Sequence, residues 1–367
     1  MSTDLTPTRL ASLRESLIRK EVDALLVAGP ENRRYLSGFT ADDPHCGILL
    51  ISRERALLLT DFRYREWAEN EAQDFEVAVY QEQNKTLMEL LKDLRVSRLG
   101  FEAAHLTYRQ YHRLTESAAD AGLQMEVRPL DGLVEELREV KRPEELAAIR
   151  RALTLTETVL RIVAGQLAPG LTERQVAWEI EKRLREGGSE GVAFPPIVAA
   201  GPNSARPHHH PGDYPLKMGE PVIIDMGARV AGYAADMTRT LILGEPDNQF
   251  RKIYSLVRRA QERAEKGLKA GMDSLAGDAL AREVITQAGY GEAFGHSLGH
   301  GVGLAVHEAP SLSPFKDPAA ILKAGSVVTV EPGIYLTGWG GVRLENMALI
   351  TEDGAEVLNK DLEFYEW

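Results

Sequence analysis

The feature that most constrains the fold is a repeat within the C-terminal two thirds of the chain. Each half of this region has two helical patterns, a histidine-containing stretch and a predicted β-hairpin that carries two carboxylates. The first hairpin covers residues 220–240 and the second covers residues 326–351. Such a repeat predicts two related halves that face one another across a pseudo-twofold axis. The four carboxylates would then meet at one central site.

The first hairpin, EPVIIDMGARVAGYAADMTRT, carries Asp225 and Asp236 on its two arms. Their midpoint falls at 230–231, within the turn, so we expect the two side chains to lie directly opposite one another on one face of the ladder. Two carboxylates held that close repel one another unless a cation or a proton lies between them. The pair therefore predicts a metal site.

The second hairpin, SVVTVEPGIYLTGWGGVRLENMALIT, carries Glu331 and Glu345 on either side of a turn centred on Gly338. Two histidine segments accompany the hairpins: RPHHHP (206–211) before the first, and GHSLGHGVGLAVHE (295–308) before the second. Adjacent side chains of the triple histidine point in different directions, so at most one or two of them can reach a site. We also expect Arg343, two residues from Glu345, to pair with charge in the site, whereas for Arg239 a surface position is left open.

Four carboxylates and one imidazole fit two divalent ions, and this set, in which oxygen ligands dominate, suits Mn²⁺, Co²⁺ or Zn²⁺ better than a metal that demands thiolates. Two such ions about 3.5–4 Å apart can hold a shared hydroxide and polarise a scissile carbonyl. The reaction class indicated is metal-assisted hydrolysis. The histidines would act as general acids or as donors to a developing oxyanion.

Residues 1–136 alternate short β-rich runs with helical patterns, which predicts a small α/β domain that precedes a domain over 137–367. The expected strands are 23–29, 47–52, 55–60, 75–80, 98–102 and 124–130, and the expected helices are near 8–20, 84–94 and 107–121. The scattered histidines His45, His105 and His112 form no cluster and are expected to be surface or core residues.

The net charge of −12 argues against a nucleic-acid surface, which would need a basic face. Cys46 is the single cysteine, so no intrachain disulfide can form, which favours a reducing compartment. The N-terminal residues have no apolar run of signal-peptide length, and no stretch approaches the roughly 20 apolar residues of a membrane span. We therefore expect a cytoplasmic protein without membrane or nucleic-acid partners.

A series of motifs in the C-terminal region resembles the metallopeptidase family that includes aminopeptidase P, prolidase, methionine aminopeptidase and creatinase. The motifs are IIDMG, GYAADMTRT, GHGVGLAVHE, VEPGIY and GVRLEN. The segments YLSGFT and LTDFRY are similar to the N-terminal domain of the proline-specific branch. The resemblance implies an α+β pita-bread catalytic domain with a pseudo-twofold repeat, preceded by a smaller α/β domain. It also implies a homodimer or a larger homo-oligomer.

Carried over by position, the resemblance implies a dinuclear metal centre. Its five ligands would be Asp225, Asp236, His300, Glu331 and Glu345. Asp236 and Glu345 would bridge the ions, Asp225 would complete one site, and His300 and Glu331 would complete the other. Glu331 would also carry the proton of the attacking hydroxide.

The resemblance also implies roles for residues that do not bind metal. His208, His296 and His307 match active-site histidines that contact the substrate and stabilise the tetrahedral intermediate, and Arg343 matches an arginine next to the last ligand. His208 is preferred to His209 because it directly follows the proline of a Pro-His pattern. All five ligand positions hold ligand-type residues, which disfavours a metal-free relative such as creatinase.

Within the proline-specific branch the sequence favours an Xaa-Pro aminopeptidase, acting on short peptides with proline in second position. Several short microbial prolidases carry an arginine just after the VHE segment, where it holds the free carboxylate of a dipeptide. Here Ser311 stands at that place, and no arginine occurs between 309 and 330. An Xaa-Pro dipeptidase is the alternative, and a catalytically silent peptide-binding relative is a third reading. If a variant lost its metal without any change in peptidase activity, the result would support a catalytically silent peptide-binding protein.

Overall fold

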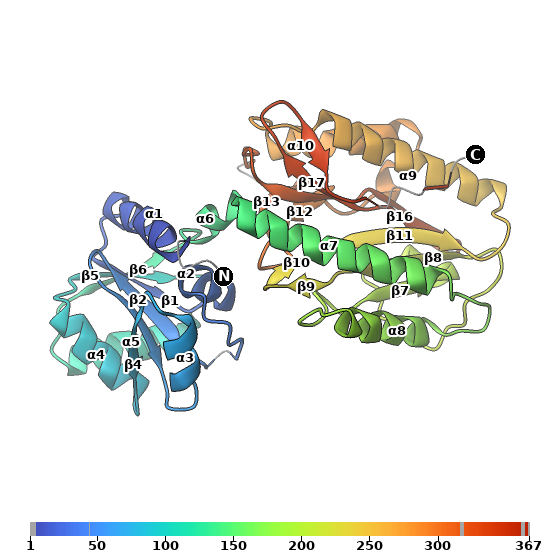
Figure 1. Cartoon of the computed structure of the whole chain (residues 1–367). Helices are drawn as coiled ribbons and strands as arrows, with labels where there is room; N and C mark the ends of the chain where they lie inside the picture. The colour runs from blue at the N-terminus through green and yellow to red at the C-terminus, as the bar shows by residue number, and fades with distance from the viewer. Residues whose placement is uncertain (1–4, 44, 316–318, 361–363, 366–367) are drawn as a thin grey trace. The chain divides into compact units, whose positions relative to one another are not determined.

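The computed structural model of the chain describes residues 5–43, 45–315, 319–360 and 364–365 (Figure 1). Contacts between residues divide the chain into two units, residues 1–138 and residues 139–367. Among the described helices, none is both long enough and apolar enough to cross a membrane.

The N-terminal unit is built on a six-stranded sheet in the order β4-β3-β2-β1-β5-β6. Its strands are β1 Ala24–Val27, β2 Ile48–Ser52, β3 Ala56–Thr60, β4 Glu76–Val79, β5 Arg98–Glu102 and β6 Glu126–Leu130. Only β2 runs antiparallel to the other strands of this sheet. The central runs ALLV of β1 and ALLLT of β3 are buried along their whole length, as expected for strands covered on both faces. All six strands expected from the sequence are confirmed.

The helices of this unit are mostly short. They are α1 Leu5–Arg19, α2 Pro30–Ser37, α3 Arg65–Glu71, α4 Gln83–Asp93 and α5 Tyr108–Asp120, and α6 Glu135–Glu139 lies at the junction of the units. The three helices expected from the sequence are confirmed, whereas α2 and α3 were missed. Helix α2 spans only eight residues, from Pro30 to the residue before a left-handed Gly38, which is too short for a clear helical period.

The C-terminal unit contains two copies of one series of elements. The first half contains α7 Pro143–Ala164, α8 Glu173–Glu186, β7 Ile197–Ala200, η1 Gly201–Ala205, β8 Pro221–Met226, β9 Arg229–Val230, β10 Tyr233–Ala234 and β11 Met237–Ile242. The second half contains α9 Asn248–Gly267, α10 Ser274–Gln287, η2 Gly291–Ala293, β12 Gly299–Gly301, β13 Glu308–Leu312, β14 Val327–Val330, β15 Gly333–Leu336, β16 Gly340–Arg343, β17 Asn346–Ile350 and β18 Ala355–Val357.

The two halves have matching strand orders. The first sheet runs β7-β8-β11 and the second contains the run β12-β14-β17, flanked by β13 and β18. Helices α7 and α8 pack on the first set of strands, and α9 and α10 pack on the second (Figure 1). Helix α8 begins at a capping box, in which the Thr172 hydroxyl accepts from the backbone amide of Gln175.

The two halves join where β11 contacts β16 and β17. The hydroxyl of Thr240 donates to the Arg343 carbonyl (2.8 Å) and accepts from the Arg343 amide (3.0 Å). Two residues further along each strand, the backbone amide of Glu345 donates to the carbonyl of Thr238 (3.1 Å). These backbone-directed bonds place the carboxylate-bearing arms of the two hairpins side by side.

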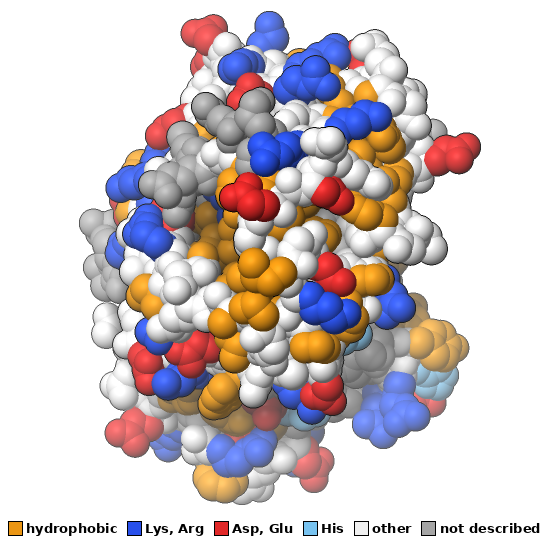
Figure 2. Space-filling view, turned by 90° about the vertical axis from the view of Figure 1, so that its right-hand side faces the viewer, with side chains coloured by type: hydrophobic (Ala, Val, Ile, Leu, Met, Phe, Trp, Pro, Cys, Tyr) orange, Lys and Arg blue, Asp and Glu red, His pale blue; other side chains and the backbone are white. Residues whose placement is uncertain are grey.

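The surface is mixed in charge on the face that Figure 2 shows, where basic and acidic side chains alternate with apolar ones. The candidate site residues named from the sequence all lie inside the C-terminal unit.

Candidate active site

One cavity of about 340 Å³ in the C-terminal unit is lined by all nine side chains that the sequence singles out as site residues. They are His208, Asp225, Asp236, His296, His300, His307, Glu331, Arg343 and Glu345. The remaining wall comes from Phe194, Ile197, Pro207 and Ser297. The repeat thus brings both carboxylate pairs and both histidine segments to one place.

The expectation that Asp225 and Asp236 face one another directly is wrong. Asp225 lies opposite Thr238, and Asp236 lies two residues before Thr238, which makes it a diagonal neighbour of Asp225. The cause is the turn, which is formed by Ala231 and Gly232, both with positive φ (51° and 82°). The hairpin is therefore centred one residue later than its sequence midpoint suggests, although both carboxylates still line the cavity.

The second hairpin has the register that the sequence predicts. Val330 pairs with Asn346, and Gly333 pairs with Arg343, so Glu331 and Glu345 lie opposite one another in the gap between these ladders. The turn is centred on a glycine at 338 with φ of 87°. The symmetric placement of Glu331 and Glu345 is confirmed.

The acidic side chains destabilise one another's charged forms. Burial, together with the nearby carboxylates of Glu345 and Asp225, raises the pKa of Asp236 well above its usual value. Burial and the carboxylates of Glu331 and Asp225 do the same to the pKa of Glu345. Burial raises the pKa of Glu331 to about 8. A divalent cation would relieve this repulsion by restoring the ionised forms.

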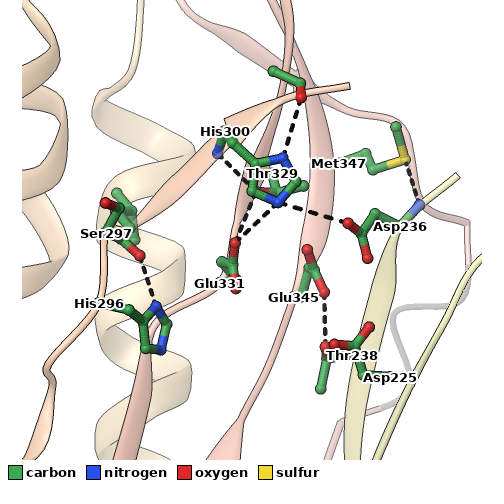
Figure 3. Close-up of polar contacts among 12 residues, drawn as sticks. Asp225, Asp236, Thr238, His296, Ser297, His300, Thr329, Glu331, Glu345 and Met347 are labelled. Atoms are coloured by element: carbon green, nitrogen blue, oxygen red, sulfur yellow. Dashed lines mark hydrogen bonds and ion pairs between the residues drawn. The ribbon is translucent and has the colours of Figure 1, made fainter. Parts of the chain in front are cut away.

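His300 is already oriented to bind a cation. Its Nδ1 lies 3.1 Å from the carbonyl oxygen of Gly301, which can only accept, so Nδ1 carries the hydrogen. Burial and the neighbouring His307 lower the pKa of His300 to about 4, so the ring is neutral near pH 7. Its Nε2 lone pair then faces Asp236 Oδ2 (3.6 Å) and Glu331 Oε1 (3.4 Å), as Figure 3 shows.

The backbone around His300 is packed too closely for larger residues. A Cβ added at Gly299 would collide with the carbonyl oxygen of Thr329 on β14. The His300 amide also donates to the Thr329 hydroxyl (3.0 Å). Glycine at position 299 therefore allows the backbone of the His300 segment to approach β14 closely.

Three ligand atoms, one each from Asp236, His300 and Glu345, lie within 4.8 Å of one another. The contacts of Asp225 also suit a cation. Its Oδ2 accepts from Arg343 Nη2 (2.7 Å), while its Oδ1 is buried and has no partner among the described residues. A buried carboxylate oxygen without a donor is costly, so this donor set fits a metal ion.

A second polar chain runs from Arg343 to His296. Arg343 Nη1 donates to the hydroxyl of Tyr335 (3.0 Å), which lies 2.9 Å from Nε2 of His296. Nδ1 of His296 lies 2.8 Å from the Ser297 carbonyl and must donate to it. Burial lowers the pKa of His296 to about 4, so its Nε2 accepts the Tyr335 hydrogen. Arg343, Tyr335 and His296 are thus held in one relative orientation.

The three histidines of the 206–211 segment separate as the sequence suggests. His208 lines the cavity and His210 is exposed outside it. His209 turns away, with its Nε2 at 2.8 Å from Glu173 Oε2. His307 also lines the cavity, and its ring centroid lies 4.2 Å from that of His300.

Comparison with known families decides the broad class. Residues 147–352 match the model of metallopeptidase family M24, and residues 9–140 match the creatinase/prolidase N-terminal domain. The chain belongs to metallopeptidase family M24. The motif resemblance described above and the pita-bread architecture are confirmed by these matches and by the solved structures below.

Relatives that match this M24 chain over almost its whole length include proteins named for action on Xaa-Pro substrates. It is 35% identical to the Xaa-Pro dipeptidase of Pyrococcus furiosus over 352 residues, which cover 96% of this chain and 97% of that protein. The structure of an Xaa-Pro dipeptidase from Bacillus anthracis aligns with a TM-score of 0.92 and 37% identity, over 98% of this chain and 99% of the other. An X-Pro aminopeptidase structure from Thermotoga maritima aligns with a TM-score of 0.85 and 37% identity, over 93% and 96% of the two chains.

Two further residues organise this M24 site: Tyr335, which sequence reasoning missed, and Arg239, for which it left a surface position open. Tyr335 lies four residues after Glu331 on the same arm, and the period-two alternation of a strand offers a signal for it. Arg239 is buried, and it donates to the Glu345 carbonyl (2.7 Å) and to Asn346 Oδ1 (3.0 Å). Arg239 therefore supports the backbone of Glu345 and is not among the residues that line the cavity.

Proposed function

We propose that this M24 metallopeptidase is an Xaa-Pro dipeptidase, which hydrolyses the bond between the first residue and proline. The observation that carries the proposal is end-to-end similarity to two proteins named Xaa-Pro dipeptidases, from Pyrococcus furiosus and Bacillus anthracis. This replaces the aminopeptidase that the sequence alone favours. A cavity of about 340 Å³ is of a size that suits a small peptide.

Five side chains would hold two divalent metal ions, with Mn²⁺ preferred to Co²⁺ or Zn²⁺. They are Asp225, Asp236, His300, Glu331 and Glu345. Support comes from the unpartnered Oδ1 of Asp225, the neutral His300 and the mutual repulsion of the carboxylates. When bound, such ions supply a water of lowered pKa and polarise the scissile carbonyl.

The chain's own groups would bind and orient the substrate and move the proton. Glu331 is the proton carrier we propose, taking a proton from the attacking water and delivering it to the proline nitrogen as the C–N bond breaks. Burial raises the pKa of Glu331 to about 8, and a bound cation would lower it again, so that the ionised carboxylate can accept the proton. The exposed rings of His208 and His307 lie at the cavity, where they would donate to the substrate carbonyl oxygen.

Arg343 serves orientation in this scheme. It fixes Asp225 through Nη2 and holds the Tyr335 hydroxyl against His296 through Nη1. His296, with Nδ1 donating to Ser297 and Nε2 accepting from Tyr335, would form a fixed polar wall beside the substrate. Phe194 and Ile197 supply apolar surface that suits a proline ring or an apolar first residue.

One observation favours an Xaa-Pro aminopeptidase as the second candidate. A dipeptide needs a cation for its free carboxylate, and Arg343 is the one Lys or Arg among the described residues that line the cavity. Arg343 already contacts Asp225, Tyr335 and the Pro207 carbonyl. A longer peptide makes no such demand, and the Thermotoga maritima relative is named an X-Pro aminopeptidase.

The deciding experiment compares hydrolysis of matched Xaa-Pro and Xaa-Pro-Yaa peptides after metal reconstitution with Mn²⁺ and Co²⁺. A dipeptidase is expected to show kcat/KM at least about tenfold higher for the dipeptide, a difference of about 1.4 kcal/mol in transition-state stabilisation. Equal or better hydrolysis of the tripeptide would replace the dipeptidase with the aminopeptidase. Full activity in a metal-free preparation would contradict both.

A further inference from the structure

Glu173 is a buried carboxylate whose bonding partners all belong to one segment. It is the first residue of α8 and is fully buried. Its Oε1 accepts from the Ala200 amide (2.9 Å) and from Asn203 Nδ2 (3.0 Å). Its Oε2 accepts from the Gly212 amide (3.0 Å) and lies 2.8 Å from His209 Nε2. Four groups of the segment 200–212 therefore converge on one side chain.

The same segment is also held from the cavity side. Arg343 Nη1 donates to the Pro207 carbonyl (3.3 Å), and the Gly341 amide donates to the Ser204 hydroxyl (2.7 Å). His208 lies between the two sets of bonds, because Pro207 is bonded to Arg343 and His209 is bonded to Glu173. His208 has no hydrogen-bond partner of its own recorded among the described residues, so its neighbours determine its direction.

His208 lies in a turn, and there His208 and His209 point to different sides of the backbone. With His209 directed into the interior at Glu173, His208 points into the cavity. The His209 ring is largely buried, with 10% of its side chain exposed, and the carboxylate beside it is an acceptor, so Nε2 donates. A turn of His209 away from Glu173 would leave a buried carboxylate oxygen with one donor fewer.

We propose that Glu173 and His209 are positioning residues that orient His208 toward the substrate. The proposal rests on the proposed function, in which His208 donates to the substrate carbonyl. Neither residue reaches the cavity, so both act through His208. A shift of about 1 Å in a group that contacts the substrate can lower the rate by about 100-fold, so the effect of losing this pair should be measurable.

The test uses full-length, metal-loaded protein and the Xaa-Pro substrate. His209→Ala removes the donor to Glu173, and we expect kcat/KM to fall by about 10- to 100-fold, mainly through kcat. His209→Gln keeps an N–H donor at this position and is expected to recover most of the loss. His210→Ala, in the same segment but exposed, is the matched control and should retain wild-type kinetics.

A double-mutant cycle separates positioning from a general structural role. If His209 acts through His208, adding His209→Ala to His208→Ala should lower kcat/KM by less than about twofold further. Independent losses that multiply would overturn the proposal. Glu173→Gln should show the same lack of additivity with His208→Ala. Metal content should equal that of the wild type in all of these variants.

Crystal structures of His209→Ala and of the wild type give a readout that does not depend on activity. The expected result is a His208 ring that leaves the cavity or becomes disordered, with His296 and the five proposed ligands unmoved. An unchanged His208 ring would overturn the proposal. Wild-type kcat/KM in the single His208→Ala variant would instead contradict the role of His208 in the proposed function. The crystal structures do not test that role, so the two failures can be told apart.

Discussion

The side chains of the site carry protons that a metal ion must displace. Burial raises the pKa of Glu331 to about 8, and burial together with neighbouring carboxylates raises the pKa values of Asp236 and Glu345. Because the pKa of Glu331 is about 8, its carboxyl is protonated at pH 7 without metal, whereas a ligating carboxylate is ionised. Binding of metal should therefore release protons.

We expect at least about one proton to leave per subunit when Mn²⁺ binds at pH 7, and fewer as the pH passes 8, because Glu331 is then already ionised. Titration calorimetry in buffers that differ in ionisation enthalpy measures this number. Glu331→Gln should reduce the release, although it also removes a proposed ligand. A proton count that stays constant between pH 6 and 9 would contradict the scheme.

At the same scale, residue type and spacing were enough to find the site, but not its internal contacts. All nine side chains named from the sequence line the cavity. They could be identified because the motifs that contain them are long and occur in a fixed order. The Arg343–Tyr335–His296 chain and the His209–Glu173 pair join residues far apart in the sequence. Such contacts depend on how the two halves pack, and no local pattern records them.

Among the elements, the hairpin of β8 and β11 shows how turn chemistry sets register. Its turn residues Ala231 and Gly232 both adopt positive φ, yet the sequence VAGY has no Asn-Gly or Asp-Gly signal at these positions. The sequence midpoint therefore lay one residue too early. The second hairpin was placed correctly because Gly338 marks the centre of its turn.

Ala231 is strained by its φ of 51°, so Ala231→Asn should stabilise the protein by about 0.5–1 kcal/mol, because Asn tolerates this conformation better. Urea unfolding at a fixed metal concentration measures the change. The neighbouring Gly232→Ala should destabilise by about 1 kcal/mol or more, since φ is 82° there. A destabilised Ala231→Asn variant would show that other contacts of the turn outweigh its backbone strain.

Helix α10 holds the His296 segment much as α8 holds that of His208. Asp278 is buried and accepts from the Leu298 amide (2.9 Å). Arg282 pairs with Asp278 and donates to the carbonyls of Phe294 (2.8 Å) and His296 (2.6 Å). In both halves of the repeat, the second helix therefore fixes a segment that brings a histidine to the cavity.

Arg282→Met should destabilise the protein by about 1–3 kcal/mol, because the partly buried carbonyls and the buried Asp278 would lose a charged donor. It should also lower kcat/KM through displacement of His296. Arg263→Met is a suitable control, since Arg263 of α9 forms an exposed pair with Glu283 of α10 and should change stability by no more than about 0.5 kcal/mol. Equal effects of the two substitutions would argue against the proposed role of Arg282 in holding the His296 segment.

At the scale of the whole chain, the proposed ligands all come from residues 225–345 and therefore from one of the two units. Ligand binding stabilises the state that binds it by RT ln(1 + [L]/Kd), about 2.7 kcal/mol at 100 times Kd. The added free energy belongs to the unit that contains the site. Metal should thus protect residues 139–367 against local unfolding, without a comparable effect on residues 1–138.

Hydrogen exchange measured with and without Mn²⁺ tests this expectation. The largest slowing should fall on the amides of β8, β11, β14 and β17, which carry or flank the proposed ligands, while β1 and β5 of the N-terminal sheet should exchange at unchanged rates. Asp236→Asn, which removes one proposed ligand, serves as the control and should abolish the difference. Equal protection of both units would mean that metal binding couples them, and protection confined to the N-terminal sheet would contradict the site itself.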